Sequence, residues 1–197
     1  MLSIFFHYLH TVKSYIFFLV VFLFVSCADM KRPKQLKEIE RIEANLNDAE
    51  MVLNSISIDS IEQIIRSSTF LENRIKKYYS GDTISLSLGE DLELFHALIP
   101  NSEEVVFGVI KIDSMLLFRK SQLNLLKNDI QQGAGNRSEY DENIFFENEE
   151  VSVVANFANF YDSLATASLT TFNNLHIEVE KFSIKCEKEF KIQQKLQ

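Results

Sequence analysis

Cysteine and histidine often carry catalysis or metal binding, and this sequence contains only two cysteines and four histidines. Cys27 and Cys186 are far apart in the chain, and His96 and His176 are the histidines outside the apolar N-terminal segment. Neither histidine has a cysteine, a second histidine or paired acids at the spacing of a metal site. There is also no glycine-rich phosphate loop, GxSxG or CxxC. We therefore expect no enzyme activity, cofactor or metal.

Cys27 follows an apolar run that is too short to cross a membrane. The uninterrupted run covers residues 15–25, eleven residues, whereas a membrane-spanning helix needs roughly 20. Lys13 and the amino terminus place positive charge before the run, and the small Ser26 follows it. This order is typical of a signal peptide.

The four residues Phe24-Val25-Ser26-Cys27 resemble the lipobox of bacterial lipoproteins, with phenylalanine in place of the usual leucine. The resemblance implies cleavage before Cys27, a diacylglycerol on its thiol and a further acyl chain on the new amino terminus. Two or more acyl chains anchor a protein stably at a membrane surface. The alternative is a signal peptide without lipidation, or a signal anchor in which Cys27 is incidental.

This interpretation divides the chain into a signal peptide (1–26), a lipidated cysteine with its tether (27–34) and a helical bundle domain (35–197). It predicts a lipid-anchored protein of the cell envelope. Ala28 and Asp29 do not resemble the enterobacterial inner-membrane retention signal, so the outer membrane is favoured over the inner. The sequence leaves open whether the protein faces the periplasm or the cell surface.

The remaining chain is acidic. Lys13 is the only charged residue among the first 26, which leaves 19 basic and 28 acidic residues and a net charge of −9. Nucleic-acid binding needs clustered basic residues, so we expect no nucleic-acid partner. If Cys27 carries lipid, Cys186 has no partner for an intramolecular disulfide, and its place on an apolar helix face indicates packing.

Glycine and proline are scarce and fall mostly between periodic apolar segments, which is typical of an all-α chain. The periodicity predicts helices over 35–56, 59–81, 101–130 and 144–193, with a loop at 131–143. A continuous helix through residue 57 stays open. Residues 83–99 alternate like a strand but also step like a helix, and a short helix ending at Pro100 is favoured. Asp59 with Glu62 and Ser87 with Glu90 resemble capping boxes.

The C-terminal helix has the strongest pattern. Its apolar positions alternate steps of three and four over five heptads, which indicates a coiled-coil seam. A second apolar face in the first half of this helix predicts that this half is buried inside a bundle. In the helix over 101–130, apolar residues occur around most of the circumference, which predicts that it is the most buried helix. The expected fold is therefore an all-α, elongated antiparallel helical bundle or coiled coil with a long C-terminal helix. The seam comprises Val151, Val154, Ala158, Tyr161, Ala165, Ser168, Phe172, Leu175, Val179, Phe182 and Cys186, and the second face Val153, Phe157, Phe160 and Leu164.

Two surface features are candidates for contact with a partner. Ile144, Phe145 and Phe146 lie within the acidic stretch 138–150, where apolar residues framed by acids on a loop suit a docking contact. The lysines at 181, 185, 188 and 195 share one flank of the last helix. They are interpreted as a solvated face, with binding to acidic glycans or lipid as the alternative.

His96, among apolar neighbours, is expected to be a half-buried structural histidine.

A short pattern of aspartate, then serine or threonine, then an apolar residue occurs four times. It resembles the O-glycosylation motif of exported proteins in the Bacteroidota, and this implies modification at Ser60, Thr83, Ser114 and Ser163. Thr83 fits best because it lies in a predicted loop. The alternative is that Asp59 is a cap, Asp82 a turn residue, and the other two aspartates ordinary mid-helix residues.

The chain as a whole resembles the small helical lipoproteins common in Bacteroidota, a class that brings no known active site. We expect a non-enzymatic binding or scaffold module whose partner is an envelope protein or a glycan. The alternative is a coiled-coil lipoprotein that self-assembles into a homo-oligomer. An enzyme would require a cleft that gathers His96 or His176 with carboxylates.

Overall fold

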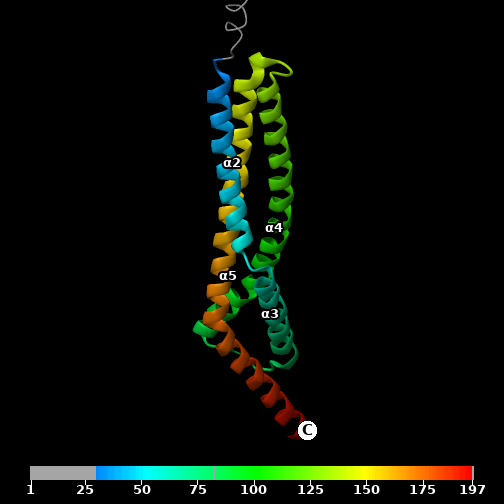
Figure 1. The fold of residues 1–197 in the computed structure, drawn as a ribbon. Coiled ribbons are helices and arrows are strands. Elements are labelled where there is room, and N and C mark those ends of the chain that lie inside the picture. The colour runs from blue at the N-terminus through cyan, green and yellow to red at the C-terminus, as the bar shows by residue number, and fades with distance from the viewer. Residues whose placement is uncertain (1–29, 82, 197) are drawn as a thin grey trace, which may run out of the picture.

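The computed structural model describes residues 30–81 and 83–196, and all of their regular elements are helical. Figure 1 shows them as a long rod. In the described part of the chain, no helix is long and apolar enough to span a membrane. The elements are α2 (Arg32–Ser55), α3 (Ile58–Tyr78), α4 (Leu86–Gln132), η1 (Arg137–Glu139) and α5 (Tyr140–Leu196).

The rod has three columns. α2 and α3 follow one another down the first column, α4 returns along the second, and α5 runs down the third beside both (Figure 1). α2 and α5 are parallel, because Arg41 contacts Asn148 near the top and Ser55 contacts Asp162 lower down. At about 1.5 Å per residue, α5 extends over roughly 85 Å. The predicted all-α elongated bundle with a long C-terminal helix is confirmed.

The predicted seam of α5 forms its buried stripe. Its members from Val151 to Ser168 are buried, as are Val179 and Cys186. Between and below them Phe172, Leu175 and Phe182 are only half-buried, and Ser183 is buried instead of Phe182. The stripe faces α2 and the upper part of α4 above, and α3 and the beginning of α4 below.

The junction of α2 and α3 is a real break, at Ile56 and Ser57. The backbone of Ile56 is extended, and the Ser57 hydroxyl accepts a hydrogen bond from the amide of Ser60. The N-cap is therefore Ser57 and not the predicted Asp59, which lies within the first turn. α2 also begins earlier than predicted, at Arg32, so the predicted tether 27–34 includes a helical part.

The prediction that Pro100 ends a helix was wrong. Residues 86–132 form one helix that contains Pro100, and the strand alternative for 83–99 is also wrong. Proline lacks the N–H that would bond the carbonyl four residues earlier, which kinks a helix. Figure 1 shows that the beginning of α4 slants across the rod before the helix turns upward. Its N-cap is Ser85, which accepts from the amide of Leu88, and not the predicted Ser87.

The connection between α4 and α5 is shorter than the predicted loop 131–143. α4 ends at Gln132 and is capped by Gly133, whose φ of 67° is the left-handed conformation that glycine adopts readily. α5 already begins at Tyr140, whose hydroxyl donates to the carbonyl of Asp129 at 3.0 Å. The acids at the start of α5 lie where the helix dipole favours negative charge.

The predicted burial of a second face of α5 was wrong. Of that face, Val153, Phe157 and Phe160 are 43–54% exposed. On α4, Ile110 and Leu117 are also more than 60% exposed, so part of its wide apolar wrap meets solvent. In a three-column rod each helix has only two neighbours, so one stripe per helix is covered and further apolar faces meet solvent.

Candidate functional site

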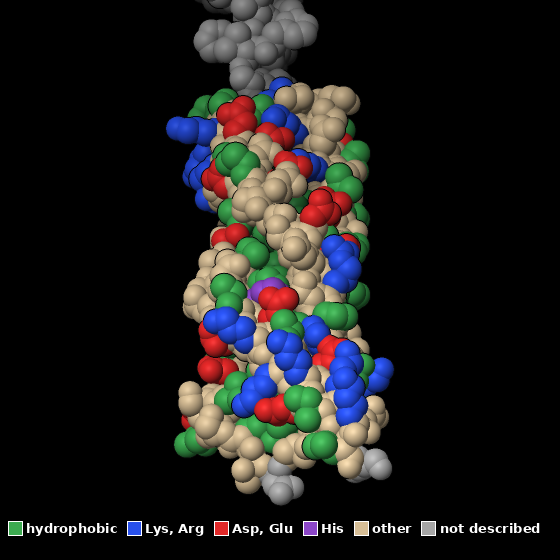
Figure 2. Space-filling model, turned by 90° about the horizontal axis from the view of Figure 1, so that it is seen from below, with side chains coloured by type: hydrophobic (Ala, Val, Ile, Leu, Met, Phe, Trp, Pro, Cys, Tyr) green, Lys and Arg blue, Asp and Glu red, His purple; other side chains and the backbone are tan. Residues whose placement is uncertain are grey.

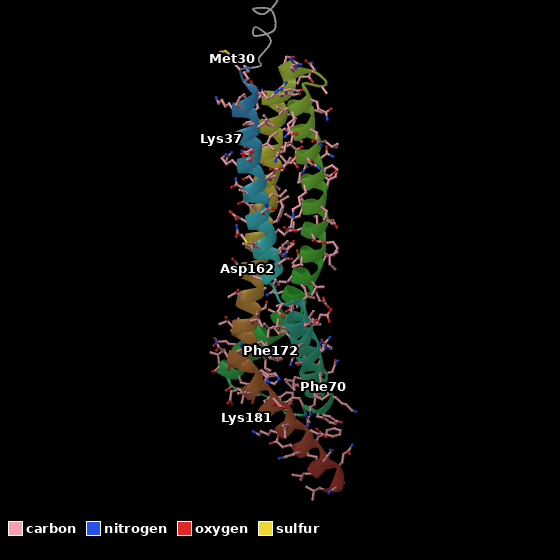
Figure 3. The ribbon with its side chains drawn as sticks, viewed as in Figure 1. Met30, Lys37, Phe70, Asp162, Phe172 and Lys181 are labelled. Carbon is pink, nitrogen blue, oxygen red and sulfur yellow. The ribbon has the colours of Figure 1, made fainter. Side chains whose placement is uncertain are left out.

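Cys27, the residue with the most specific predicted chemistry, lies outside the described residues, as does the predicted signal peptide 1–26. The described chain begins at Met30, which Figure 3 places at the upper end of the rod, and α2 follows from Arg32. Lys34 and Lys37, in the first turns of α2, are exposed.

The four candidate glycosylation residues are not brought together. Thr83 is exposed in the irregular connection between α3 and α4. Ser60 lies in the first turn of α3, 2.8 Å from the Ser57 hydroxyl, and is half-buried. Ser114 and Ser163 are exposed but lie inside α4 and α5. Thr83 therefore has the most accessible backbone of the four.

The apolar trio in the acidic stretch is helical and divides between core and surface. Ile144 is buried at 6% exposure, so its prediction as a partner contact was wrong. Phe145 and Phe146 are exposed by 65% and 54%. Consecutive helical residues point about 100° apart, which is why one apolar run serves both the core and the surface.

His96 differs from its prediction as a half-buried residue. Its side chain is 66% exposed, and Nδ1 lies 2.6 Å from Glu72 Oε1. Lys76 also contacts Glu72, at 2.8 Å. Burial by itself raises the pKa of Glu72, but the hydrogen bonds from Lys76 and His96 outweigh it and leave that pKa lowered. His176 instead packs against the Phe172 ring, at 4.6 Å between ring centroids.

Cys186 is buried and unpaired in the described chain. Burial raises the pKa of its thiol, so the thiol is protonated and unreactive at neutral pH. In the described residues, no group of three His, Cys, Asp or Glu side chains is arranged to hold a metal ion.

The lysine flank of α5 carries ion pairs with neighbouring acids. Lys181 contacts Glu178 at 2.7 Å and Lys185 contacts Glu189 at 3.8 Å. Figure 2 views the molecule from below and shows Lys and Arg side chains interspersed with Asp and Glu. The mixed charge agrees with a solvated face.

A groove of about 420 Å³ lies between the parallel helices α2 and α5. Its wall carries three asparagines, and Arg41 donates to Asn148 Oδ1 at 2.8 Å. In the described structure the side chains of Asn45 and Asn159 have no hydrogen-bond partner. The lining residues are Arg41, Asn45, Asp48, Ala49, Val52, Asn148, Val151, Ser152, Ala155 and Asn159.

This groove was missed by the sequence reasoning. Asparagines are spread along both helices, and nothing in the sequence gives the offset that places Asn45 beside residues of α5. A carboxamide donates and accepts hydrogen bonds at once. The groove therefore suits a ligand that also offers both, such as a peptide backbone or the hydroxyls of a glycan.

A second feature covers the side of the rod where α4 and α5 meet. Tyr161 packs against Gly108 at one end, and Arg119 lies 5.0 Å from the Phe118 ring and 5.7 Å from the Phe146 ring at the other. Exposed large apolar side chains occupy this side, which is called the α4–α5 apolar face below. It comprises Phe107, Phe118 and Leu125 of α4 and Phe146, Val153, Phe157 and Phe160 of α5.

Beneath this face an ion-pair cluster joins the two helices. Arg119 contacts Glu150 and lies 3.5 Å from Glu147, and the side chains of Arg119 and Glu147 are only 13% and 10% exposed. Burial raises the pKa of Glu147, although the Arg119 charge opposes the effect. The cluster fixes how α4 and α5 pair, because it links positions far apart in the sequence.

Comparison with known proteins adds no relative: no family model, no curated protein and no solved structure matches this chain.

Proposed function

We propose that the protein is a lipid-anchored, extracytoplasmic helical rod that acts as a non-enzymatic binding or scaffold module of the cell envelope. The observation that carries the binding role is the amide-lined groove between α2 and α5. Its free carboxamides at Asn45 and Asn159 match a partner rich in hydrogen-bonding groups, such as an envelope protein or a glycan.

The anchor at Cys27 is supported by the lipobox resemblance and by the position of α2. Cys27 precedes Arg32 by five residues, so the chain between them reaches at most about 17 Å. The upper end of the rod would then stay close to the bilayer. The exposed Lys34 and Lys37 at that end suit anionic headgroups. The outer membrane remains the favoured location.

Metabolic labelling with a fatty-acid analogue tests the anchor. Wild-type protein should carry the label and fractionate with membranes, whereas Cys27→Ala should lose the label and change its mature mass. Cys186→Ala is the matched control and should keep the label. An unchanged mass and membrane fraction for Cys27→Ala would refute lipidation.

Photocross-linking in the native envelope tests the binding role. A photoreactive amino acid at Ser152, an exposed groove residue, should capture a protein or glycan partner, and Asn45→Ala with Asn159→Ala should reduce capture. A probe at Ala44, exposed on α2 but outside the groove lining, is the control. Equal capture from both positions would count against the groove.

O-glycosylation is proposed at Thr83, because the motif resemblance there coincides with an exposed, irregular backbone. Intact mass of the mature protein measures it. Thr83→Ala should remove any glycan mass, whereas Ser60→Ala, at a half-buried residue bonded to Ser57, should leave it.

A further inference from the structure

We propose that the α4–α5 apolar face is the interface of an antiparallel homodimer. The inference goes beyond the proposed function, because it names a second copy as the partner of a different surface. It does not depend on the groove between α2 and α5, and because an antiparallel pair has its two N-terminal ends at opposite ends of the rod, both copies cannot be anchored in one membrane.

The first argument is area. Seven large apolar side chains on this face are between 43% and 65% exposed. Taking roughly 200 Å² for the full surface of such a side chain, they present roughly 700 Å² to solvent. A stable interface buries about 800 Å² on each partner, and the largest apolar patch of a typical monomer is about 300–600 Å². The face is therefore larger than an ordinary monomer patch and comes close to the area of a dimer interface.

The second argument is charge. Residues 151–161 of α5 contain no Asp, Glu, Lys or Arg, and residues 105–118 of α4 contain only Lys111 and Asp113. Acids flank this segment at Glu103, Glu104 and Glu149. A centre depleted of charge and rich in aromatics, with a charged rim, is the composition of a protein interface. Flanking acids oppose docking on an anionic lipid surface, so a protein surface is favoured over a membrane.

The third argument is self-complementarity. Gly108 lies against Tyr161 and Arg119 against Glu147 and Glu150, so Val153 is level with the part of α4 around Ser114. Bulky residues flank this small centre on both sides. Phe160 and Phe146 are each seven residues from Val153, and Phe107 and Phe118 are seven and four residues from Ser114.

A two-fold axis through this level, perpendicular to the helices, would place each end of the face against the opposite end of the second copy. The Phe107 and Phe160 end of one rod would then meet the Phe118 and Phe146 end of the other. Such a face is complementary to itself, as a closed two-fold dimer requires. The small, exposed Ser114 at the centre lets the two α4 helices approach closely.

Cysteine cross-linking of the full chain in intact cells tests the proposal. Ser114→Cys lies at the proposed axis, so a short thiol-reactive cross-linker should give a product of twice the monomer mass that contains only this chain. Ala44→Cys is exposed on α2, away from this face, and should give none. Wild type controls for the two native cysteines.

Asn128→Cys tests the orientation. It is exposed on α4 two heptads above Ser114, so two copies of it would be roughly 40 Å apart in an antiparallel pair at about 1.5 Å per residue. It should therefore give no dimer. Cross-linking through Asn128→Cys as efficient as through Ser114→Cys would mean a parallel pair and would overturn the antiparallel arrangement.

Charge substitution on the Ser114→Cys background tests the apolar contact itself. Phe107→Glu should lower the cross-linked fraction at least about tenfold, because burying one unpaired charge costs more than 1.4 kcal/mol. Phe70→Glu is the control, since Phe70 on α3 is 63% exposed and Phe107 is 65% exposed. Monomer alone, or a product that contains another protein, would overturn the proposal.

Discussion

At the scale of single residues, Gly108 leaves space on α4 for the ring of Tyr161 from α5. A Cβ atom built there would overlap ring atoms of Tyr161. Gly108→Ala gains about 1 kcal/mol of helix propensity, but overpacking against the ring costs about 1–3 kcal/mol. We expect a net loss of about 1 kcal/mol in the free energy of unfolding, measured by urea denaturation.

Gly89→Ala is the matched control for that prediction. Gly89 is also helical and in α4, but a Cβ there would meet only Ile84 Cδ1 at 3.6 Å, an ordinary contact. The propensity gain is then unopposed, and we expect about 0.5–1 kcal/mol of added stability. If Gly108→Ala stabilises the protein as Gly89→Ala does, the prediction that Tyr161 packs tightly against Gly108 is wrong.

The buried Glu147 and the half-buried Glu72 should affect the pH dependence of stability in opposite directions. Burial raises the folded pKa of Glu147, so its ionisation costs stability as pH rises above its ordinary value of 4.5. The pKa of Glu72 is lowered by Lys76 and His96 despite burial, so its contribution is present above pH 4.5 and is lost as pH falls through the folded pKa.

The loss in the free energy of unfolding that Glu147→Gln causes, relative to wild type, should therefore shrink as pH rises from 3.5 to 7. The loss that Glu72→Gln causes should grow over the same range. The growth should be only about 0.5 kcal/mol, because the partners of Glu72 are exposed. Urea denaturation at several pH values measures both. Slopes of the same sign would contradict the opposed environments of the two carboxyls.

At the scale of elements, Ser85 and Ser87 at the start of α4 look alike in the sequence as candidate N-caps, but only Ser85 caps the helix. Ser85 accepts from the amide of Leu88 at 3.3 Å, whereas Ser87 lies inside the first turn. Ser85→Ala should cost about 1 kcal/mol of stability, as the loss of an N-cap does. Ser87→Ala should cost little, and thermal denaturation compares the two. A larger loss from Ser87→Ala would restore the predicted capping box.

The helices and the α5 seam were predictable because burial repeats with the period of the helix. The seam residues from Val151 to Ser168 are apolar or small at every step, and they are buried. The kink at Pro100 was not predictable, because proline ends one helix and bends another according to what packs around it. The exposure of Ile110 and Phe157 was missed because periodicity shows which residues are apolar but not which are covered.

The candidate site was less predictable than the fold. Phe145 and Phe146 were correctly selected as exposed, but their neighbour Ile144 is in the core. The α2–α5 groove depends on the relative shift of two helices that are parallel and joined through a third. That shift is set by contacts such as Arg41 with Asn148, which link residues 107 positions apart and leave no pattern in the local sequence.

At the scale of the whole molecule, the rod has an upper and a lower half that meet where two of its three columns are interrupted. The first column breaks between Ser55 and Ile58, and α4 contains Pro100 near the same junction. Buried hydroxyls of Ser102 and Ser168 also lack hydrogen-bond partners. α5 alone continues through both halves as an uninterrupted helix without proline, so we expect the two halves to open independently of each other.

Hydrogen exchange on two cavity variants tests this independence. Phe95→Ala removes a lower-half ring that lies 6.2 Å from the Phe172 ring, and Leu116→Ala removes a buried upper-half side chain. Each should cost about 2–5 kcal/mol locally. Phe95→Ala should reduce protection in α3 and the last third of α5, and Leu116→Ala should reduce it in α2.

The wild-type protein should already show the asymmetry. Seven of the 26 buried apolar residues lie in α3, before Pro100 in α4 or after residue 165 in α5, so the lower half has the smaller core and should exchange faster. If either variant lowers protection equally in both halves, the rod unfolds as one cooperative unit. The uninterrupted α5 would then couple the halves more strongly than the breaks in the other two columns separate them.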